Sequence, residues 1–454
     1  MARDTTNGTG RRRPRVVVIG GGFAGFTTAR SLARIMGDDV EIVLVSPTNY
    51  FLYLPLLPEV AAGILEPRRI SVSLAASLPP CVRSAIGEVD ELDLDARRVG
   101  WLDPEGQHHE VTYDRVVLAA GSVHKILPVP GVSDHAQGFR GVPEALYLRD
   151  HIIRQIDLAA LCEDPAERTA RCTFVVVGAG YTGTEVTAQG QLFTEELARL
   201  RGLGAGSTRW VLVSRGKVLA GLDRHLADTA DRVLRERGVD VRCEETVEEA
   251  GPDTVRLSSG EEVPTRTLLW CVGVRPDPLV EDLDVQVDGG RVVVDRYLTV
   301  PDHPDVFACG DAAAVPAPGR PGEYTAMTAQ HAVRQGKLAG RNVAASLGYG
   351  RRRPYRHRDL GFVVDLGGRD AAANPLHVPL TGLPAKIVTR GYHLVSMPGN
   401  RVRTLVDWAF EAVLDRQTAQ LGLVRSPAVP LDTASPEVPQ HHLGFPHVRT
   451  LQDG

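Results

Sequence analysis

The sequence contains few cysteines, and their spacing argues against one common kind of redox centre. There are 6 cysteines among 454 residues, and no two of them form a CxxC or a CxxxxC pair. A closely spaced dithiol, which many redox proteins use to pass on electrons, is therefore not expected. We interpret all of them as ordinary thiols, with Cys271 and Cys309 as small core residues. Cys162 and Cys172 could meet in space, but nothing in the sequence requires it.

The chain also lacks a long apolar run. None approaches the ~20 residues that a helix needs to cross a bilayer. The polar N-terminus ends in Arg11-Arg12-Arg13-Pro14-Arg15, and the apolar residues 16–25 that follow are few and rich in glycine. We interpret them as a strand and a turn rather than a signal sequence. We expect residues 1–14 to be disordered and the protein to be cytoplasmic.

No strong charge imbalance and no metal-ligand spacing is present. The net charge is -5, with 43% hydrophobic and 24% charged residues, as is ordinary for a soluble globular protein. Nucleic acid is not an expected partner. The pair His441-His442 has no partner motif nearby, so we expect no metal site.

Against this ordinary composition, two glycine-rich turns of one kind are present. Each has the pattern GxGxxG: Gly20, Gly22 and Gly25 in the first, and Gly178, Gly180 and Gly183 in the second. Apolar runs at 16–19 and 174–177 precede the turns, and helix-like stretches at 26–36 and 184–200 follow. In the dinucleotide-binding fingerprint, the first glycine allows a tight turn, the second admits a pyrophosphate, and the third lets the helix pack closely. Two such units predict two dinucleotides, as a protein that passes electrons between them would need.

Strand-like and helical stretches alternate through most of the chain, which favours an α/β fold. We expect two Rossmann-like dinucleotide-binding domains and a smaller C-terminal α+β region. The expected parts are a disordered N-terminus at 1–14, a discontinuous FAD-binding domain at 15–150 and 291–350, an NAD(P)H-binding domain at 151–290, a C-terminal region at 351–425 and a flexible tail at 426–454.

The C-terminal region contains one predicted amphipathic helix at 401–417. Its apolar stripe consists of Val402, Leu405, Val406, Ala409, Phe410, Val413 and Leu414, with Trp408 beside it. Such a stripe suits the surface of a membrane, a dimer interface or ordinary core packing. Because the polar face mixes acids with arginines, we expect only modest attraction to anionic lipid.

These features resemble the flavin-dependent pyridine-nucleotide reductases of glutathione-reductase-like fold. The resemblance rests on four elements: the first turn with Ala119-Ala120-Gly121, the second turn with Glu185, the turn at 273–276, and Cys309-Gly310-Asp311. Three further segments are similar to type II NADH dehydrogenases, the single-chain, non-proton-pumping NADH:quinone oxidoreductases. They are 49–61, 329–335 and Gly391-Tyr392-His393-Leu394, which leads into the helix around Trp408.

The resemblance implies that the first unit binds FAD. The backbone contacts implied for FAD are those of Gly20, Gly22, Gly25, Ala120 and Gly121. Asp311 would accept a hydrogen bond from the ribityl chain, although it could instead be a simple N-cap before Ala312. Ser46 stands where an acid usually holds the adenosine ribose, so we expect that end of FAD to be held less firmly.

The second unit would bind the nicotinamide nucleotide through backbone contacts. These contacts would come from Gly178, Gly180, Gly183 and Gly273. Glu185 resembles the family's glutamate near the point where nicotinamide stacks on the flavin, or it is a first-turn acid that complements the helix dipole. Arg215 follows the strand 210–213, where an NADH-specific site usually has an acid. An arginine accommodates the 2′-phosphate of NADPH, which predicts use of NADPH at least as well as NADH. Alternatively, Arg215 points into solvent.

For the electron acceptor, the resemblance implies a quinone on the opposite face of the flavin, in a pocket lined by Gln330. The family's second glutamine position is Arg334 here, with Gln335 one place later, so the polarity of the pocket differs. Tyr50 and Pro55 either shape the flavin site or belong to a segment that packs as core. Lys386 is a candidate polar contact near the quinone.

We therefore predict an FAD-dependent NAD(P)H:quinone oxidoreductase with Glu185 and Gln330 as catalytic candidates. Peripheral contact with the inner face of the cell membrane and a homodimer are further expectations. Three alternatives stay open: a reductase of ferredoxin or a small molecule, a sulfide:quinone reductase, and a non-catalytic redox-sensing flavoprotein. The sulfide:quinone chemistry would need two redox cysteines beside the flavin, and the sequence shows no evident pair.

Overall fold

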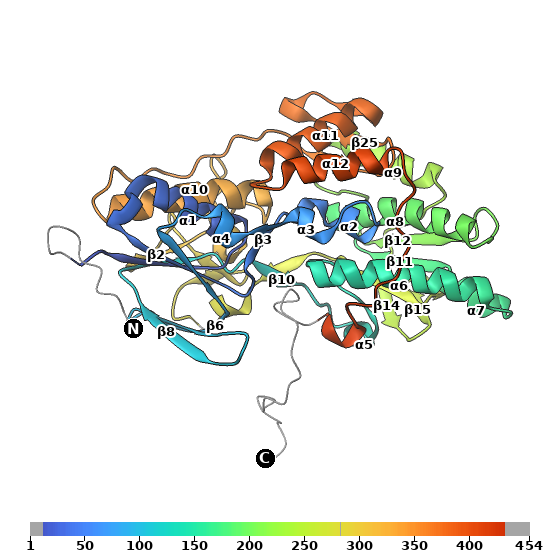
Figure 1. The fold of residues 1–454 in the computed structure, drawn as a ribbon, viewed down its shortest axis with the longest axis horizontal. Helices are drawn as coiled ribbons and strands as arrows, with labels where there is room; N and C mark the ends of the chain where they lie inside the picture. Colours follow the sequence, from blue (N-terminus) through green and yellow to red (C-terminus); the bar gives the residue numbers. More distant parts are fainter. Residues whose placement is uncertain (1–11, 282, 432–454) are drawn as a thin grey trace, which may run out of the picture.

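The structure, a computed structural model, describes residues 12–281 and 283–431. Two parallel sheets with their helices form the two halves of the molecule, and C-terminal helices lie along one edge of both (Figure 1). The predicted α/β fold with two Rossmann-like units is confirmed. Residues 1–11 of the predicted disordered N-terminus and residues 432–454 of the predicted tail lie outside the described residues.

The first sheet contains strands from two distant parts of the chain. Its order is β21-β22-β9-β1-β2-β5, and every neighbouring pair except β21–β22 is parallel. The strands are β1 (Arg15–Ile19), β2 (Glu41–Ser46), β5 (Val82–Ile86), β9 (Arg115–Leu118), β21 (Thr299–Val300) and β22 (His303–Ala308). The strand β22 therefore brings residues that follow the second unit back beside the first.

Two helices cover this sheet and pack on each other closely. They are α1 (Phe23–Met36) and α10 (Ala329–Ser346), side by side at one end of Figure 1. A Cβ at Gly336 would lie 2.3 Å from the Ala24 oxygen, and one at Gly340 would lie 2.8 Å from the Thr28 oxygen. Only glycine permits this contact, which fixes the start of α10 beside the first glycine turn.

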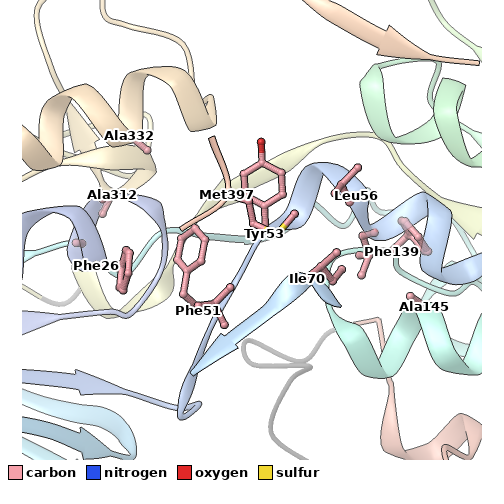
Figure 2. Packing of buried hydrophobic residues seen from close by; sticks show 14 of the residues in the cluster. Phe26, Phe51, Tyr53, Leu56, Ile70, Phe139, Ala145, Ala312, Ala332 and Met397 are labelled. Carbon is pink, nitrogen blue, oxygen red and sulfur yellow. The ribbon is translucent and has the colours of Figure 1, made fainter. Parts of the chain in front are cut away.

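Short elements surround the first sheet. They are β3 (Tyr50–Leu52), α2 (Leu57–Ala61), α3 (Pro67–Ile70), β4 (Ser71–Ser73), α4 (Leu74–Ser77), β6 (Glu88–Asp93), β7 (Arg98–Leu102), β8 (His108–Thr112), β20 (Arg291–Val293) and β23 (Ala313–Ala314). Within the segment 49–61, Phe51 and Tyr53 are core residues that are 3% and 2% exposed. Tyr50 and Pro55 are only half-buried, so their expected part in shaping the flavin site stays a prediction. Phe51 stacks on Phe26 of α1 with 4.8 Å between ring centroids, and Figure 2 shows Met397 next to Tyr53.

The second sheet is fully parallel and has the order β13-β12-β11-β17. Its elements are α6 (Val142–Leu161), α7 (Pro165–Arg171), β11 (Thr173–Val177), α8 (Tyr181–Leu200), β12 (Arg209–Ser214), α9 (Arg224–Glu236), β13 (Asp240–Cys243) and β17 (Thr267–Trp270). The strand at 173–177 ends as predicted, whereas α8 begins at Tyr181, inside the glycine turn. An antiparallel sheet accompanies it, formed by β14 (Val247–Ala250), β15 (Thr254–Leu257) and β16 (Glu262–Pro264).

A short antiparallel pair joins the two halves. β10 (Ser122–His124) follows β9, β18 (Val274–Pro276) follows β17, and the two strands pair with each other. Each strand begins within a few residues of the carboxyl end of a parallel strand. The pair therefore brings the carboxyl ends of both sheets together, and ligands of open α/β sheets bind at such ends.

The C-terminal region differs from the prediction in its helices. It contains β24 (Val363–Asp365), β25 (Ala371–Ala373), β26 (Leu380–Thr381), α11 (Gly382–Ser396) and α12 (Arg401–Glu411). The segment 391–394 lies inside α11, which was not predicted. α12 ends at Glu411 and is shorter than the predicted helix 401–417. After it, Glu196 of α8 binds both the backbone N–H and the guanidinium of Arg416, at 3.3 and 3.7 Å. Beyond that point, Val429 and Leu431 are buried.

Candidate functional site

The first glycine turn has the geometry of a pyrophosphate cradle. Gly20 has φ 99°, and a Cβ there would lie 2.2 Å from the Ala119 oxygen. A Cβ at Gly25 would lie 1.9 Å from the Gly20 oxygen, so only glycine lets α1 approach the strand. Gly22 begins α1 and faces open space, with no heavy atom within 4 Å of a Cβ built there. The free N–H groups at this helix N-terminus are suited to a phosphate.

The second glycine turn repeats this geometry. Gly178 has φ 104°, and its Cβ would lie 2.2 Å from the Cys271 oxygen. A Cβ at Gly183 would lie 1.8 Å from the Gly178 oxygen, while Gly180 at the start of α8 faces open space. The structure thus gives both predicted turns the three glycine roles of a dinucleotide site.

The segments that join the two halves are open beside the turns. Gly121 follows Ala120 after β9 with φ 84°, and Gly273 precedes β18 with φ 113°. A Cβ at either glycine would meet no atom within 4 Å. The Asp277 N–H donates to the Gly121 oxygen at 3.2 Å, so the two open segments are tied to each other.

Asp311 lies at the edge of this region and does not serve as a helix cap. Its carboxylate accepts a hydrogen bond from Ser122 Oγ at 2.8 Å, and Cys309 occupies the N-cap position of its short 3-10 helix. Burial raises the pKa of Asp311 above its usual range. The neighbouring Gly310 N–H donates to Gln335 Oε1 at 2.7 Å, so Gln335 braces this turn and does not replace a glutamine of the acceptor pocket.

The residues after the second strands of the two units differ. Ser46 is 3% exposed, and a Cβ at Gly21 would lie 2.5 Å from its hydroxyl. Arg215 after β12 is exposed, as is Lys217, and the structure gives no hydrogen bond or ion pair to either side chain within the described ranges. The first position is closed and small, and the second is open and positively charged.

Glu185 lies on α8 facing the C-terminal region. Its Oε1 accepts a hydrogen bond from the Asp365 N–H at 3.0 Å. The α8 helix has no acid in its first turn, so Glu185 is not the dipole-complementing residue that was the alternative. Part of the side chain is accessible, yet protein atoms surround the carboxyl group densely, and this desolvation raises its pKa to about 8.

Asp365 of β24 organises a buried polar cluster that the sequence reasoning missed. Lys386 Nζ donates to both carboxylate oxygens of Asp365 at 2.6 Å, and Gln189 Nε2 donates to Oδ1 at 3.0 Å. Lys386 is 4% exposed, so the candidate acceptor contact is an interior ion pair. The only signal in the sequence is an acid within the apolar segment Val363–Leu366.

A second missed acid lies nearby. Glu59 of α2 is 2% exposed and accepts a hydrogen bond from Trp408 Nε1. Trp408, which was expected beside the apolar stripe, is 3% exposed and faces inward from α12. His393 of α11 is also buried, bonds through Nδ1 to the Tyr53 hydroxyl at 3.1 Å, and has its pKa lowered by burial to about 4.

Gln330 occupies the first turn of α10. Its Nε2 donates to the Gly361 oxygen at 2.9 Å, and its Oε1 accepts from Arg334 at 3.2 Å. Arg334 also donates to the Arg358 oxygen at 2.8 Å. Arg334 therefore joins Gln330 to the segment 358–361 by hydrogen bonds. It does not take the place of the family's second glutamine in the acceptor pocket.

Among the described residues, no two cysteines form a disulfide, and the one group of side chains with the spacing of metal ligands is already paired with an arginine. All the cysteines are free, so Cys162 and Cys172 are not joined. Glu91, His108 and Glu110 come within 4.8 Å of one another, but Arg98 already pairs with Glu91 at 2.8 Å and Glu110 at 3.7 Å.

Comparisons with known proteins agree with this geometry. The family described as pyridine nucleotide-disulphide oxidoreductase matches residues 14–336. A type II NADH:quinone oxidoreductase of Mycobacterium tuberculosis is 31% identical over 438 residues, covering 90% of this chain and 89% of the relative. A demethylphylloquinone reductase of Synechocystis is 29% identical, covering 85% and 93%. The solved structure of Plasmodium falciparum NDH2 with NADH has a TM-score of 0.81 at 16% identity, covering 90% and 100%, and so shares the fold.

Proposed function

The chain belongs to the pyridine nucleotide-disulphide oxidoreductases and, within them, to the type II NADH:quinone oxidoreductases, and we propose that it transfers two electrons from NAD(P)H through FAD to a quinone. The observation that carries the proposal is the pair of matching glycine turns. Each faces open space at the carboxyl end of a parallel sheet, and β10 and β18 bring those ends together.

The first unit fits FAD. Gly20, Gly22 and Gly25 would hold the pyrophosphate, and the desolvated carboxylate of Asp311 would accept a hydrogen bond from a ribityl hydroxyl. FAD supplies the hydride acceptor and the two-electron donor of the reaction. The protein contributes the orientation of both substrates and the exclusion of water.

The second unit fits the nicotinamide nucleotide and supports the use of NADPH. Arg215 and Lys217 are exposed and free of protein partners in the described ranges, where an acid would otherwise select NADH. Charge-assisted hydrogen bonds from an arginine fork suit a phosphate. The protein therefore accepts NADPH at least as well as NADH.

Glu185 was expected near the nicotinamide, but it binds Asp365, the partner of the acceptor-side candidate Lys386, and we therefore assign it to the acceptor side. There, Gln330 and Glu185 act directly on the reaction. Gln330 is held rigidly by Gly361 and Arg334, so that its amide can orient a quinone oxygen. With a pKa raised to about 8, Glu185 is mostly neutral at pH 7 and can donate a proton. Lys386 is buried against Asp365 and supports this side from within.

The exposed apolar face of α11 and α12 supports peripheral contact with a membrane. Large apolar side chains on it are more than half exposed: Leu383 55%, Ile387 65%, Val395 76%, Val402 74%, Leu405 53% and Phe410 56%. No helix among residues 12–281 and 283–431 has the length and apolar character of a membrane span. A quinone dissolved in lipid would reach the acceptor side from this face, on the cytoplasmic side of the membrane.

Steady-state turnover tests the function against its alternatives. Purified, FAD-loaded protein should oxidise NADPH rapidly with a short-chain quinone. If turnover is negligible and a long-lived flavin–nicotinamide charge-transfer complex accumulates, the protein is a redox sensor. Rapid turnover with ferredoxin but none with quinone would mean that the electron acceptor is ferredoxin and not a quinone.

A further inference from the structure

A glutamate is buried in a short helix that is otherwise apolar. Glu59 lies in α2, where Leu57, Val60 and Ala61 are buried hydrophobic residues. α2 packs against α8 and lies below α11 and α12 in Figure 1. Because a buried, unpaired carboxylate is costly, a residue in this place is either paired with a cation or neutral.

Glu59 has one hydrogen bond and no ion pair within the described ranges. Its Oε2 accepts from Trp408 Nε1 at 2.5 Å, and its Oε1 is buried without a protein partner. The Arg390 guanidinium is stacked over the Trp408 ring, 4.9 Å from the centroid, and donates to Glu411 at 3.2 Å instead. The carboxyl group of Glu59 therefore has the environment of a neutral acid.

Burial is the main reason that the pKa of Glu59 is raised, and the negative charge of Asp365 adds to the rise. Two cations of α11 and the hydrogen bond of Trp408 act in the opposite direction. Two arginines on elements packed against α2 are paired with other acids and are not free to neutralise Glu59. These pairs are Arg149 of α6 with Glu66 and Asp150, and Arg69 of α3 with Asp407 of α12.

Several buried polar atoms around Glu59 have no protein partner. Besides Glu59 Oε1, they are Gln189 Oε1, Arg390 Nε and the Nη1 atom of Arg416. Buried polar groups are almost always hydrogen-bonded, and buried water satisfies those that the protein does not. The cluster between α2, α8, α11 and α12 is therefore a place for ordered water.

The cluster connects the surface with Glu185. At its outer end, Arg416 lies 3.7 Å from Glu196 and 3.9 Å from Glu411, whose side chains are 20% and 18% exposed. At its inner end, Gln189 binds Asp365, and the Asp365 N–H binds Glu185. A negative charge on Glu59 would raise the pKa of Glu185, so Glu185 lies within electrostatic range of Glu59.

The proposed reaction needs such a connection. Reduction of a quinone to a hydroquinone takes two electrons and two protons. The hydride of NAD(P)H carries both electrons and one proton, so one further proton must come from solvent in each turnover. A carboxyl group beside the quinone that is connected to solvent can supply that proton.

Resting on the proposed function, we propose that Glu59 stores this proton and passes it through the buried water to Glu185. Glu185 gives its proton to a quinone oxygen and becomes a carboxylate. The O–H bond of Glu59 then breaks as a proton moves along the water to Glu185, which is neutral again. Glu59 regains a proton from solvent by way of the groups around Arg416. Glu59 touches no substrate and acts through Glu185.

Glu59→Gln tests the proposal, because glutamine keeps an acceptor for Trp408 and cannot release a proton. We expect flavin reduction by NADPH to stay within about twofold of wild type, and quinone reduction to slow by about 100-fold, the usual size of a positioned proton transfer. The matched control is Glu66→Gln, at a glutamate just after α2 whose side chain is 50% exposed, and it should leave both rates unchanged.

Infrared spectroscopy of the FAD-loaded protein supplies a readout that is independent of turnover. Wild type should show protonated-carboxyl C=O absorption at neutral pH that titrates away as the pH rises, and Glu59→Gln should lose the contribution of Glu59 while that of Glu185 remains. Unchanged quinone reduction in Glu59→Gln, or a Glu59 that is ionised at neutral pH, would overturn the proposal.

Trp408→Phe keeps Glu59 and removes the hydrogen-bond donor of its carboxyl group. This variant tests the proposal even if Glu59→Gln fails to bind FAD. Because that hydrogen bond lowers the pKa of Glu59, its loss should move the falling limb of the rate of quinone reduction to higher pH. A limb that does not move would contradict the proposal. A failure of the proposed function would look different from a failure of the role of Glu59. In that case no quinone would reoxidise the wild-type protein, although the infrared band of Glu59 would remain.

Discussion

The two glycine turns are almost the same in geometry, but the positions after their second strands are not. At both turns the first glycine has a positive φ near 100°, the third lies against the oxygen of the first, and the second faces open space. After β2 comes the buried Ser46, packed beside Gly21, whereas after β12 come the exposed Arg215 and Lys217.

On the proposed function, the turn would provide the pyrophosphate contact common to both dinucleotides, and the end of the second strand would set which dinucleotide binds and whether it is released. A closed, uncharged position suits a cofactor that stays bound through many turnovers. An open, positively charged position suits a phosphorylated substrate that must enter and leave in every turnover.

Valine at the third glycine of each turn gives the largest expected effects. Its Cβ would lie 1.9 Å from a backbone oxygen in Gly25→Val and 1.8 Å in Gly183→Val, and such overpacking costs about 3 kcal/mol or more. Gly25→Val should yield colourless protein. Gly183→Val should yield yellow protein that NADPH no longer reduces. Absorbance and anaerobic reduction check both, and Gly204→Ala, where a Cβ meets no atom within 4 Å, is the control. The opposite pattern of colour would reverse the assignment of the two units.

Arg215→Asp addresses the open end of the second strand. Losing the charge-assisted hydrogen bonds, worth about 1.5–3 kcal/mol, should lower kcat/KM for NADPH by about 10- to 100-fold and leave that for NADH equal or higher. Lys217→Ala should have a smaller effect in the same direction. The account of this site is wrong if the ratio of the two kcat/KM values does not change.

The apolar face of α12 is exposed, and the proposed membrane contact is the third comparison between variants. Val402→Ser and Phe410→Ser each remove an exposed apolar side chain, so each should weaken binding to lipid vesicles several-fold, within the ~1.5–3 kcal/mol of a buried side chain. Turnover with a water-soluble quinone should stay at the wild-type level. Co-sedimentation with vesicles measures the first and a steady-state assay the second. If both variants bind vesicles as wild type does but no longer dimerise, this face is a dimer interface.

The pH dependence of stability gives the smallest expected effect. The pKa of Glu185 is raised to about 8 in the folded protein from 4.5, so its contribution is fully present below pH 4.5 and is lost as the pH rises to about 8. Between those values the Tm of wild type should fall more than that of Glu185→Gln, by about 2–4 °C. Equal slopes in thermal melts of the two proteins would mean that the carboxyl group is not desolvated.

Local patterns in the sequence predicted the nucleotide units, because a strand, a glycine turn and a helix are specified by neighbouring residues. The strand at 173–177 and the roles of Gly20 and Gly178 follow from such patterns. The start of α8 at Tyr181 was missed, since the glycines that form the turn also form the first turn of the helix.

Contacts between distant residues could not be predicted in this way. Trp408 and Glu59 are 349 positions apart, and Asp365 and Glu185 are 180 apart. Helical periodicity placed Trp408 beside an apolar stripe, but only the packing of α12 on α2 shows that its ring faces inward. The acceptor side is therefore the part that the sequence described least completely.

The most direct test of the central claim is anaerobic mixing of the yellow protein with NADPH and then with a short-chain quinone, followed by flavin absorbance. NADPH should bleach the flavin absorbance, and the quinone should restore it quickly. Bleaching without recovery, or a preparation that cannot be reconstituted with FAD, would contradict it.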